Sequence, residues 1–329
     1  MTKHVLVYRP LPADQLAALR ARFDVTVLER PQAHDPDFRA AVATAHGLIG
    51  ASVKLDRALL DTAPALEVIS SISVGYDNYD LPYLKARGIL LTNTPDVLTE
   101  TTADTAFALI LATARRVVEL ANWVRDGHWT RNIGAAHYGT DVHHKRLGIV
   151  GFGRIGAAVA RRGRLGFGME VLYCNDSARP ELEAELGARR RTLDELLQEA
   201  DFVCLNLPLL PQTEGLIGAR EFALMRPETI FINASRGRVV DEAALIEALR
   251  TGRIRAAGLD VFEREPLPAD SPLPRLPNVV ALPHIGSATH ETRAAMARCA
   301  AENLIEALSG RRPPNLVDAS VWEDRRAAR

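Results

Sequence analysis

The sequence predicts an α/β protein made of two doubly wound parallel-sheet domains, one of which is split along the chain. Short apolar segments alternate with helical patterns over almost the whole length, as expected for parallel sheets covered by helices. A glycine-rich turn between a strand and a helix spans residues 151–156, and the 150 residues before it suffice for a separate domain. A long helical pattern at residues 291–308 follows the last strand-like segment.

The first hundred residues form a small α/β unit of their own. Its strand-like segments are His4–Tyr8, Asp24–Leu28, Gly47–Ala51, Leu66–Ile72 and Ile89–Thr92. From Thr99 the pattern changes to a long helix with a capped start, whose apolar residues recur through Ala121. The segment from Gly127 to His144 has no clear period, and long irregular loops of this kind are usually functional or form an interface.

The second half supplies the strands of another parallel sheet. They are expected at Leu147–Val150, Met169–Cys174, Phe202–Leu207, Thr229–Ala234, Ala257–Phe262 and Val279–Leu282. The last long helix, Glu291–Leu308, follows a completed sheet, so we expect it to return to the first unit. The predicted domains are therefore residues 1–98 with 288–329, and residues 99–287. The charged tail Trp322–Arg329 is expected to fray.

The glycine-rich turn has the features that bind a dinucleotide pyrophosphate. Gly151 permits the tight turn, Gly153 lets the backbone approach the phosphates, and Gly156 lets the helix pack closely on its strand. The helix N-terminus offers unpaired N–H groups to the anion. Asp176 follows about 20 residues later, where an acidic side chain would hold a ribose hydroxyl. A purely structural glycine turn is the alternative, but the strand–turn–helix context favours nucleotide binding and a Rossmann-like domain.

Composition excludes several classes of function. The net charge of -1 gives no electrostatic footprint for nucleic acid or for an anionic membrane. No stretch is apolar enough to cross a bilayer, and the N-terminus has no signal-peptide pattern, so we expect a cytoplasmic protein. Cys174, Cys204 and Cys299 have no metal-ligand spacing and are expected to be buried free thiols. No metal site is predicted.

Three residues at strand ends could carry out chemistry. Arg236, Glu265 and His284 follow three successive strand segments, and ligands of open α/β sheets bind at that edge. Together they suit reduction of a 2-keto acid. Arginine offers a planar fork to the carboxylate, and histidine can donate a proton near neutral pH. Glutamate, accepting from the other ring nitrogen, would fix the tautomer.

Each of these residues also has a simpler interpretation. Arg236 could pair with Asp241, Glu265 could be a solvated loop charge, and His284 could be a hydrogen-bonded turn residue. Their common position beside a nucleotide motif favours the catalytic interpretation. By contrast, His128 and the pair His143–His144 lie in the irregular loop and are interpreted as surface or interface histidines.

These motifs together resemble the D-isomer-specific 2-hydroxyacid dehydrogenase family over essentially the full chain. The matching segments, besides the glycine turn, are Ser73–Asp77, Val97–Asp104, Asn233–Gly237, Gly258–Pro266 and Pro283–Thr289. Within the family, residues 138–145 and 284–292 resemble the bacterial branch of 2-ketogluconate reductases and glyoxylate/hydroxypyruvate reductases. The resemblance implies that both domains are Rossmann-like or flavodoxin-like, with residues 99–287 binding NAD(P).

The resemblance also assigns roles to individual residues. It implies that Arg236, Glu265 and His284 are the catalytic trio. Six further residues are assigned as ligand contacts. By this resemblance, Val74 and Gly75 would hold the substrate carboxylate beside Arg236, Thr102 and Asp260 would flank the nicotinamide, and Arg154 and Ile155 would bind the pyrophosphate. The helix from Thr99 and the loop after it would form a homodimer interface.

The cofactor preference is open between NADH and NADPH. Relatives that prefer NADPH tend to carry an arginine where this chain has Asp176, and an aspartate there would repel the 2′-phosphate. Strict NAD relatives, however, place the acid one or two residues earlier, at Cys174 and Asn175 here, and Arg179 is near enough in sequence to reach a phosphate. We expect an NAD(P)H enzyme that favours NADH with incomplete discrimination.

The expected function is NAD(P)H-dependent reduction of a small 2-keto acid to a D-2-hydroxy acid. His284 would act as proton donor, and the substrate is open among glyoxylate, hydroxypyruvate and 2-ketogluconate. The alternative is an NAD(H)-sensing corepressor of the same fold, since fold alone does not determine function. Turnover of any 2-keto acid separates the two hypotheses.

Overall fold

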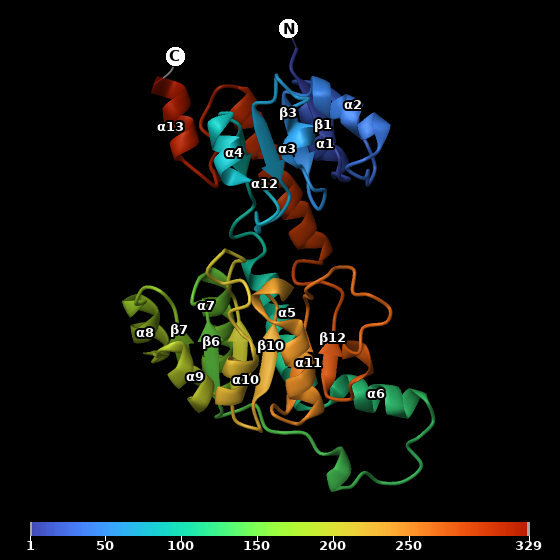
Figure 1. Cartoon of the computed structure of the whole chain (residues 1–329), viewed down its shortest axis with the longest axis vertical. Coiled ribbons are helices and arrows are strands. Elements are labelled where there is room, and N and C mark those ends of the chain that lie inside the picture. The colour runs from blue at the N-terminus through green and yellow to red at the C-terminus, as the bar shows by residue number, and fades with distance from the viewer. Residues whose placement is uncertain (1, 328–329) are drawn as a thin grey trace. The chain divides into compact units, whose positions relative to one another are not determined.

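The computed structural model describes residues 2–327, which form two compact units (Figure 1). The first, here called the split unit, contains residues 2–98 and 288–327, and the second, the inserted unit, contains residues 99–287. Each unit has its own parallel sheet with helices packed on it. The prediction of an α/β protein with two parallel-sheet domains, one of them discontinuous, is confirmed.

The split unit is built on a five-stranded parallel sheet in the order β2-β1-β3-β4-β5. Its strands are β1 His4–Val7, β2 Asp24–Val27, β3 Gly47–Gly50, β4 Val68–Ser71 and β5 Leu90–Thr92. Strands β3 and β4 are buried along their whole length, because helices cover both faces of the sheet centre. Each strand ends within a residue or two of the predicted position.

The helices of the split unit come from both ends of the chain. They are α1 Ala13–Arg20, α2 Pro36–Thr44, α3 Arg57–Leu60, α4 Leu81–Ala86, α12 His290–Leu308 and α13 Ser320–Ala327. Helix α12 packs on β3 and β4. The hydroxyl of Ser70 donates to the carbonyl of Ala300 at 2.7 Å, and a Cβ on Gly47 would lie only 2.9 Å from Leu304. Helix α12 therefore completes the core of the N-terminal sheet.

The inserted unit is built on a seven-stranded parallel sheet in the order β12-β11-β10-β9-β6-β7-β8. Its strands are β6 Arg146–Val150, β7 Glu170–Cys174, β8 Arg189–Arg190, β9 Phe202–Leu205, β10 Ile230–Asn233, β11 Ala256–Leu259 and β12 Val279–Ala281. Sequence patterns indicate all of these strands except β8. That strand is two exposed arginines at the sheet edge and has no apolar signal.

Two cores lie on the two faces of this sheet. The helices of the unit are α5 Thr99–Ala114, α6 Val117–Arg125, α7 Arg154–Arg161, α8 Pro180–Leu186, α9 Leu193–Glu199, α10 Ala219–Leu224 and α11 Glu242–Arg250. Along β6, Ile149 packs with the core beneath α5 and α7, and Val150 packs with the core beneath α9, α10 and α11. This alternation follows from the two-residue period of a strand.

The long helix predicted from Thr99 through Ala121 is wrong, because the chain turns after Ala114. Arg116 adopts a left-handed backbone with φ +55°, which no α-helix accommodates. Its guanidinium binds the Glu119 carboxylate and the carbonyl of Ala136. The apolar pattern continues across this break only because Val117 and Val118 are apolar, although both are exposed. Helix α6 and the loop that follows it extend away from the sheet of the inserted unit (Figure 1).

The predicted fraying of the tail is also wrong up to residue 327, and residues 328–329 lie outside the described part. Helix α13 buries Val321, and Arg325 donates to the carbonyls of Gly88 at 2.6 Å and Glu67 at 2.8 Å. Val321 and Arg325 therefore anchor the tail.

All three cysteines are free, but only Cys204 is fully buried; Cys174 and Cys299 are half-buried. Burial raises the pKa of Cys204 to about 12. Among residues 2–327, no helix is both long enough and apolar enough to span a membrane.

Candidate active site

The three predicted catalytic residues lie on three neighbouring loops of the inserted unit. Arg236 follows β10, Glu265 lies in the loop after β11, and His284 follows β12. Because β10, β11 and β12 are adjacent and parallel, these loops leave the sheet at the same edge.

His284 and Glu265 are in direct contact. Nδ1 of His284 lies 2.6 Å from Oε2 of Glu265, and the other carboxylate oxygen of Glu265 accepts the backbone N–H of Phe262 at 3.1 Å. An ionised carboxylate can only accept, so the hydrogen bond places a proton on Nδ1 of the imidazole. Nε2 is then the ring nitrogen that remains to act on a substrate.

The environment of Glu265 keeps its carboxylate ionised. Burial raises its pKa, but the hydrogen bond and charge of His284, the N–H of Phe262 and the charge of Arg236 together outweigh burial and lower the pKa below its ordinary value. Glu265 is therefore negatively charged at neutral pH and stabilises a positive charge on the imidazole.

The turn that carries Arg236 is fixed by Asn233 and by close backbone packing. The side chain of Asn233 donates to the carbonyl of Arg236 at 3.0 Å and accepts from the backbone of Ser235 at 3.0 Å. A Cβ on the next residue, Gly237, would overlap the carbonyl group of Phe262. The absence of that side chain lets the Arg236 turn lie directly against the loop that leads to Glu265. Neither Asn233 nor Gly237 is among the site residues predicted from the sequence.

Asp260 joins the end of β11 to the segment after His284. Its side chain, in a residue only 1% exposed, accepts the N–H groups of Ile285 at 2.7 Å and Gly286 at 2.8 Å. Burial raises the pKa of Asp260 despite these two hydrogen bonds. Thr102 of α5 is buried beside the same segment, since a Cβ on Gly286 would lie 3.2 Å from Oδ2 of Asp260 and 3.4 Å from Cγ2 of Thr102.

The glycine-rich turn connects β6 to α7. Gly151 has φ +93°, and a Cβ there would lie 2.6 Å from the carbonyl oxygen of Asn206. A Cβ on Gly156 would overlap the carbonyl oxygen of Gly151, so the helix packs closely on the turn. Gly153 is the N-cap residue of α7, and the space beside its α-carbon is open. Arg154 and Ile155 follow as the first helical residues, and this arrangement fits a pyrophosphate at the helix N-terminus.

Asp176 lies exposed, two residues beyond the end of β7. Arg190 of β8 donates to the carbonyl of Asn175 at 3.0 Å and to that of Asp176 at 2.9 Å. Asn175 in turn accepts the N–H of Phe152 from the glycine turn at 3.1 Å. A guanidinium thus lies beside the predicted ribose-binding acid, and no sequence pattern indicated it because β8 was not detected.

The two predicted substrate-binding residues belong to the split unit. Val74 and Gly75 follow β4, and the carbonyl of Val74 accepts a hydrogen bond from the side chain of Asn93 at 2.9 Å. The backbone N–H groups proposed to hold a carboxylate are therefore on a loop whose position is set by the end of β5.

The three histidines that the sequence assigns to the surface or to an interface, His128, His143 and His144, are exposed. His143 lies 3.7 Å from the Asp141 carboxylate, and the rings of His143 and His144 meet edge to face. His128 is exposed just after the end of α6. Within residues 2–327, no group of three or more histidine, cysteine or acidic side chains is arranged to hold a metal ion.

Comparison with known proteins identifies relatives along nearly the whole chain. Residues 107–286 match the model of the NAD-binding domain of D-isomer-specific 2-hydroxyacid dehydrogenases. The chain is 56% identical over 322 residues to glyoxylate/hydroxypyruvate reductase B of Klebsiella pneumoniae, covering 98% of this chain and 100% of the relative. It is 55% identical to the protein of the same name from Escherichia coli SMS-3-5, covering 98% of this chain and 99% of the relative.

Solved structures agree with these sequence relatives. A protein from Thermus thermophilus superimposes with a TM-score of 0.88 at 45% identity, covering 96% of this chain and 100% of the other. An NADPH-dependent glyoxylate/hydroxypyruvate reductase from Sinorhizobium meliloti, solved with NADP and malonate, gives a TM-score of 0.85 at 35% identity, covering 96% and 97%. The chain therefore belongs to the D-isomer-specific 2-hydroxyacid dehydrogenase family and is an NAD(P)-dependent oxidoreductase.

Proposed function

We propose that this enzyme reduces glyoxylate and hydroxypyruvate to the corresponding 2-hydroxy acids, with 2-ketogluconate as a further candidate substrate. The observation that carries the proposal is the 2.6 Å hydrogen bond between His284 and an ionised Glu265, on loops adjacent to that of Arg236. Relatives at 55–56% identity that bear the name glyoxylate/hydroxypyruvate reductase B support the same substrate class.

Each member of the trio has a distinct task in this proposal. Bound NAD(P)H supplies the hydride. Nε2 of His284 donates a proton to the carbonyl oxygen of the substrate, and Glu265 stabilises the imidazolium before that transfer. Arg236 binds the substrate carboxylate through its planar fork and polarises the neighbouring carbonyl. Val74 and Gly75 stay proposed carboxylate-binding residues on the strength of the family resemblance.

The cofactor contacts are proposed from the shape of the inserted unit. The open space at Gly153 and the N-terminus of α7 would receive the pyrophosphate, with Arg154 and Ile155 following it. Thr102 and Asp260, which converge on Gly286, would flank the nicotinamide. The buried Asp260 would hold the segment after His284 in place while the cofactor is bound.

The preference between NADH and NADPH is proposed to depend on Asp176 and Arg190. The carboxylate of Asp176 would accept from a ribose hydroxyl and repel a 2′-phosphate, which favours NADH. Arg190, and Arg179 nearby in sequence, offer positive charge that weakens this discrimination. Replacement D176A is expected to raise the kcat/KM ratio of NADPH to NADH by about tenfold, whereas R190Q should lower it. A ratio unchanged in both variants would remove these residues from cofactor selection.

The decisive test is the loss of nicotinamide absorbance with glyoxylate, hydroxypyruvate and 2-ketogluconate, each with NADH and with NADPH. Turnover of glyoxylate or hydroxypyruvate is expected, and the panel ranks the three substrates. If both cofactors bind and no 2-keto acid turns over, the reductase proposal fails and the binding-protein alternative gains weight.

We further propose that the enzyme is a homodimer joined through α6 and the loop after it. Helix α6 has no buried residue, although it contains Val117, Val118 and Val124. The loop adds three exposed large side chains: Trp129, Ile133 and Tyr138. Such a concentration of exposed apolar side chains is typical of a protein interface.

A further inference from the structure

The split unit carries a group of basic residues at the carboxyl edge of its own sheet. The strand order β2-β1-β3-β4 also orders the segments that follow these strands in space. These segments contain Arg30 after β2, Arg9 after β1, Ser52 after β3 and Val74 after β4. Ser52 therefore lies on the strand end next to that of Val74, Arg9 lies on the following strand end, and Arg30 lies at the edge strand β2.

A contact of Arg9 joins two of these strand ends. Nη1 of Arg9 donates to Oγ of Ser52 at 3.4 Å, although the two residues are on different strand ends. Burial and the charge of Arg30 lower the pKa of Arg9. Helix α12, which packs on β3 and β4, bears Arg293 in its first turn. Burial and the charge of Arg9 lower the pKa of Arg293. Both half-buried guanidinium groups thus experience a like charge.

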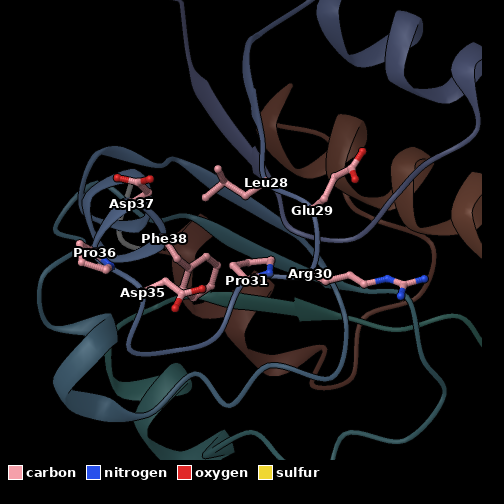
Figure 2. Close-up of a pocket in the computed structure, with 8 residues that line it drawn as sticks. All are labelled: Leu28, Glu29, Arg30, Pro31, Asp35, Pro36, Asp37 and Phe38. Atoms are coloured by element: carbon pink, nitrogen blue, oxygen red, sulfur yellow. The ribbon is translucent and has the colours of Figure 1, made fainter.

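No carboxylate neutralises these three arginines within residues 2–327. None of Arg9, Arg30 and Arg293 forms an ion pair, whereas other arginines of this chain do, as Arg57 does with Asp80 at 2.6 Å. Figure 2 shows the side chain of Arg30 extending away from Asp35 and Asp37. Glu29 lines the same pocket on the side of Arg30, but no ion pair joins the two side chains in the described part of the chain. Like charges that repel and are partly desolvated are unfavourable in the absence of an anion.

We propose that Arg9, Arg30 and Arg293, with the hydroxyl of Ser52, form an anion-binding site of the split unit for a phosphate or carboxylate group. Guanidinium groups recognise both anions through paired N–H donors, and Ser52 adds a neutral donor. Two sources share this chemistry. The first is a 2-keto acid substrate with a second anionic group at its far end; this source rests on the proposed reductase function. The second is a small anion that binds independently of the substrate.

Binding of inorganic phosphate to the full-length protein tests the site directly, by calorimetry and by the shift in thermal midpoint. We expect R9Q and R293Q to weaken phosphate binding by about tenfold or more. The matched control is R22Q, because Arg22 is exposed just before β2 and thus at the amino edge of the same sheet. Without phosphate, R9Q and R293Q should be at least as stable as the wild type, since each removes a repelled charge. If R9Q or R293Q fails to fold, R30Q, at an exposed position, replaces it in the measurement of phosphate binding and should also weaken that binding.

Kinetics then distinguish the two sources. If the site binds the substrate tail, phosphate competes with the keto acid, and R9Q raises the KM of a three-carbon keto acid bearing a terminal phosphate but not that of glyoxylate. If the site binds a separate anion, phosphate and the R9Q substitution change the KM of glyoxylate and that of the phosphorylated keto acid to the same extent. The proposal is overturned if phosphate does not bind, or binds equally to the wild type, R9Q and R293Q. These binding measurements need no turnover, so they stand even if the reductase function fails.

Discussion

At the residue scale, His284 combines a chemical role with an unusual backbone. Its φ of +54° lies in the left-handed region, which few residues other than glycine adopt, and such a conformation costs about 1–3 kcal/mol. Asp260 offsets this cost by accepting the next two backbone N–H groups. The imidazole is thereby directed onto Glu265 by a backbone that the surrounding hydrogen bonds hold in place.

Replacement of His284 by alanine is expected to lower kcat by about 10²–10⁴, because the proton donor is lost. The affinity for NADH should stay within about twofold, since the pyrophosphate and ribose contacts lie elsewhere in the inserted unit. Stopped-flow turnover and fluorescence titration of NADH measure the two quantities. H284N, which tolerates positive φ, is the matched control for backbone effects. Near-normal turnover in either variant would contradict the assignment.

The ionisation of Glu265 makes stability depend on pH in a defined direction. Because its pKa is lower in the folded protein than in an unfolded chain, ionisation favours folding above pH ~4.3, and this contribution is lost as the pH falls through the folded pKa. The free energies of unfolding of the wild type and E265Q, measured with urea, should therefore differ most near neutral pH and converge in acid. A difference between these free energies that grows as the pH falls would contradict the prediction.

At the element scale, the site lies on loops that follow three strands. The ends of these strands could be predicted from the sequence, but the contacts between the loops could not. Apolar runs located the strands, and parallel pairing placed Arg236, Glu265 and His284 at one edge. The packing of Gly237 on Phe262 joins residues far apart in sequence, and no local pattern encodes it. Strand β8 could not be predicted because its two arginines are exposed and give no apolar pattern. The break in the helix at Arg116 could not be predicted because the residues after it, Val117 and Val118, continue the apolar pattern.

Substitution G237A tests the contact between the Arg236 turn and the Glu265 loop. A methyl group there would overlap the backbone of Phe262, so we expect a stability loss of about 1–3 kcal/mol and at least a tenfold fall in kcat/KM. Urea unfolding and steady-state kinetics report the two effects. G166A is the control, since a Cβ on Gly166 meets no atom within 4 Å. Equal behaviour of the two variants would show that the contact does not position Arg236.

At the scale of the whole molecule, the exposed apolar side chains of α6 and its loop are the basis of the proposed dimer. The double variant V124E/W129E introduces two charges into this surface, where Trp129 is 60% exposed in the single chain. Sedimentation velocity should show a dimer for the wild type and a monomer for the variant. L165E, at a 73% exposed leucine after α7, should stay dimeric. A wild-type monomer, or a dimer that survives V124E/W129E, contradicts the proposed interface.

The split unit also has a consequence for how the chain folds as it is made. Its last strand ends at Thr92, but the helix that covers β3 and β4 is complete only at Leu308. At a synthesis rate of about 5–20 residues per second, the ribosome needs roughly 10–40 s to supply that cover. During this interval the inserted unit can fold as a self-contained domain, while the apolar face around Gly47 and Ser70 stays uncovered. The N-terminal half of the nascent chain is thus the part most exposed to chaperones and to misfolding, although it emerges first.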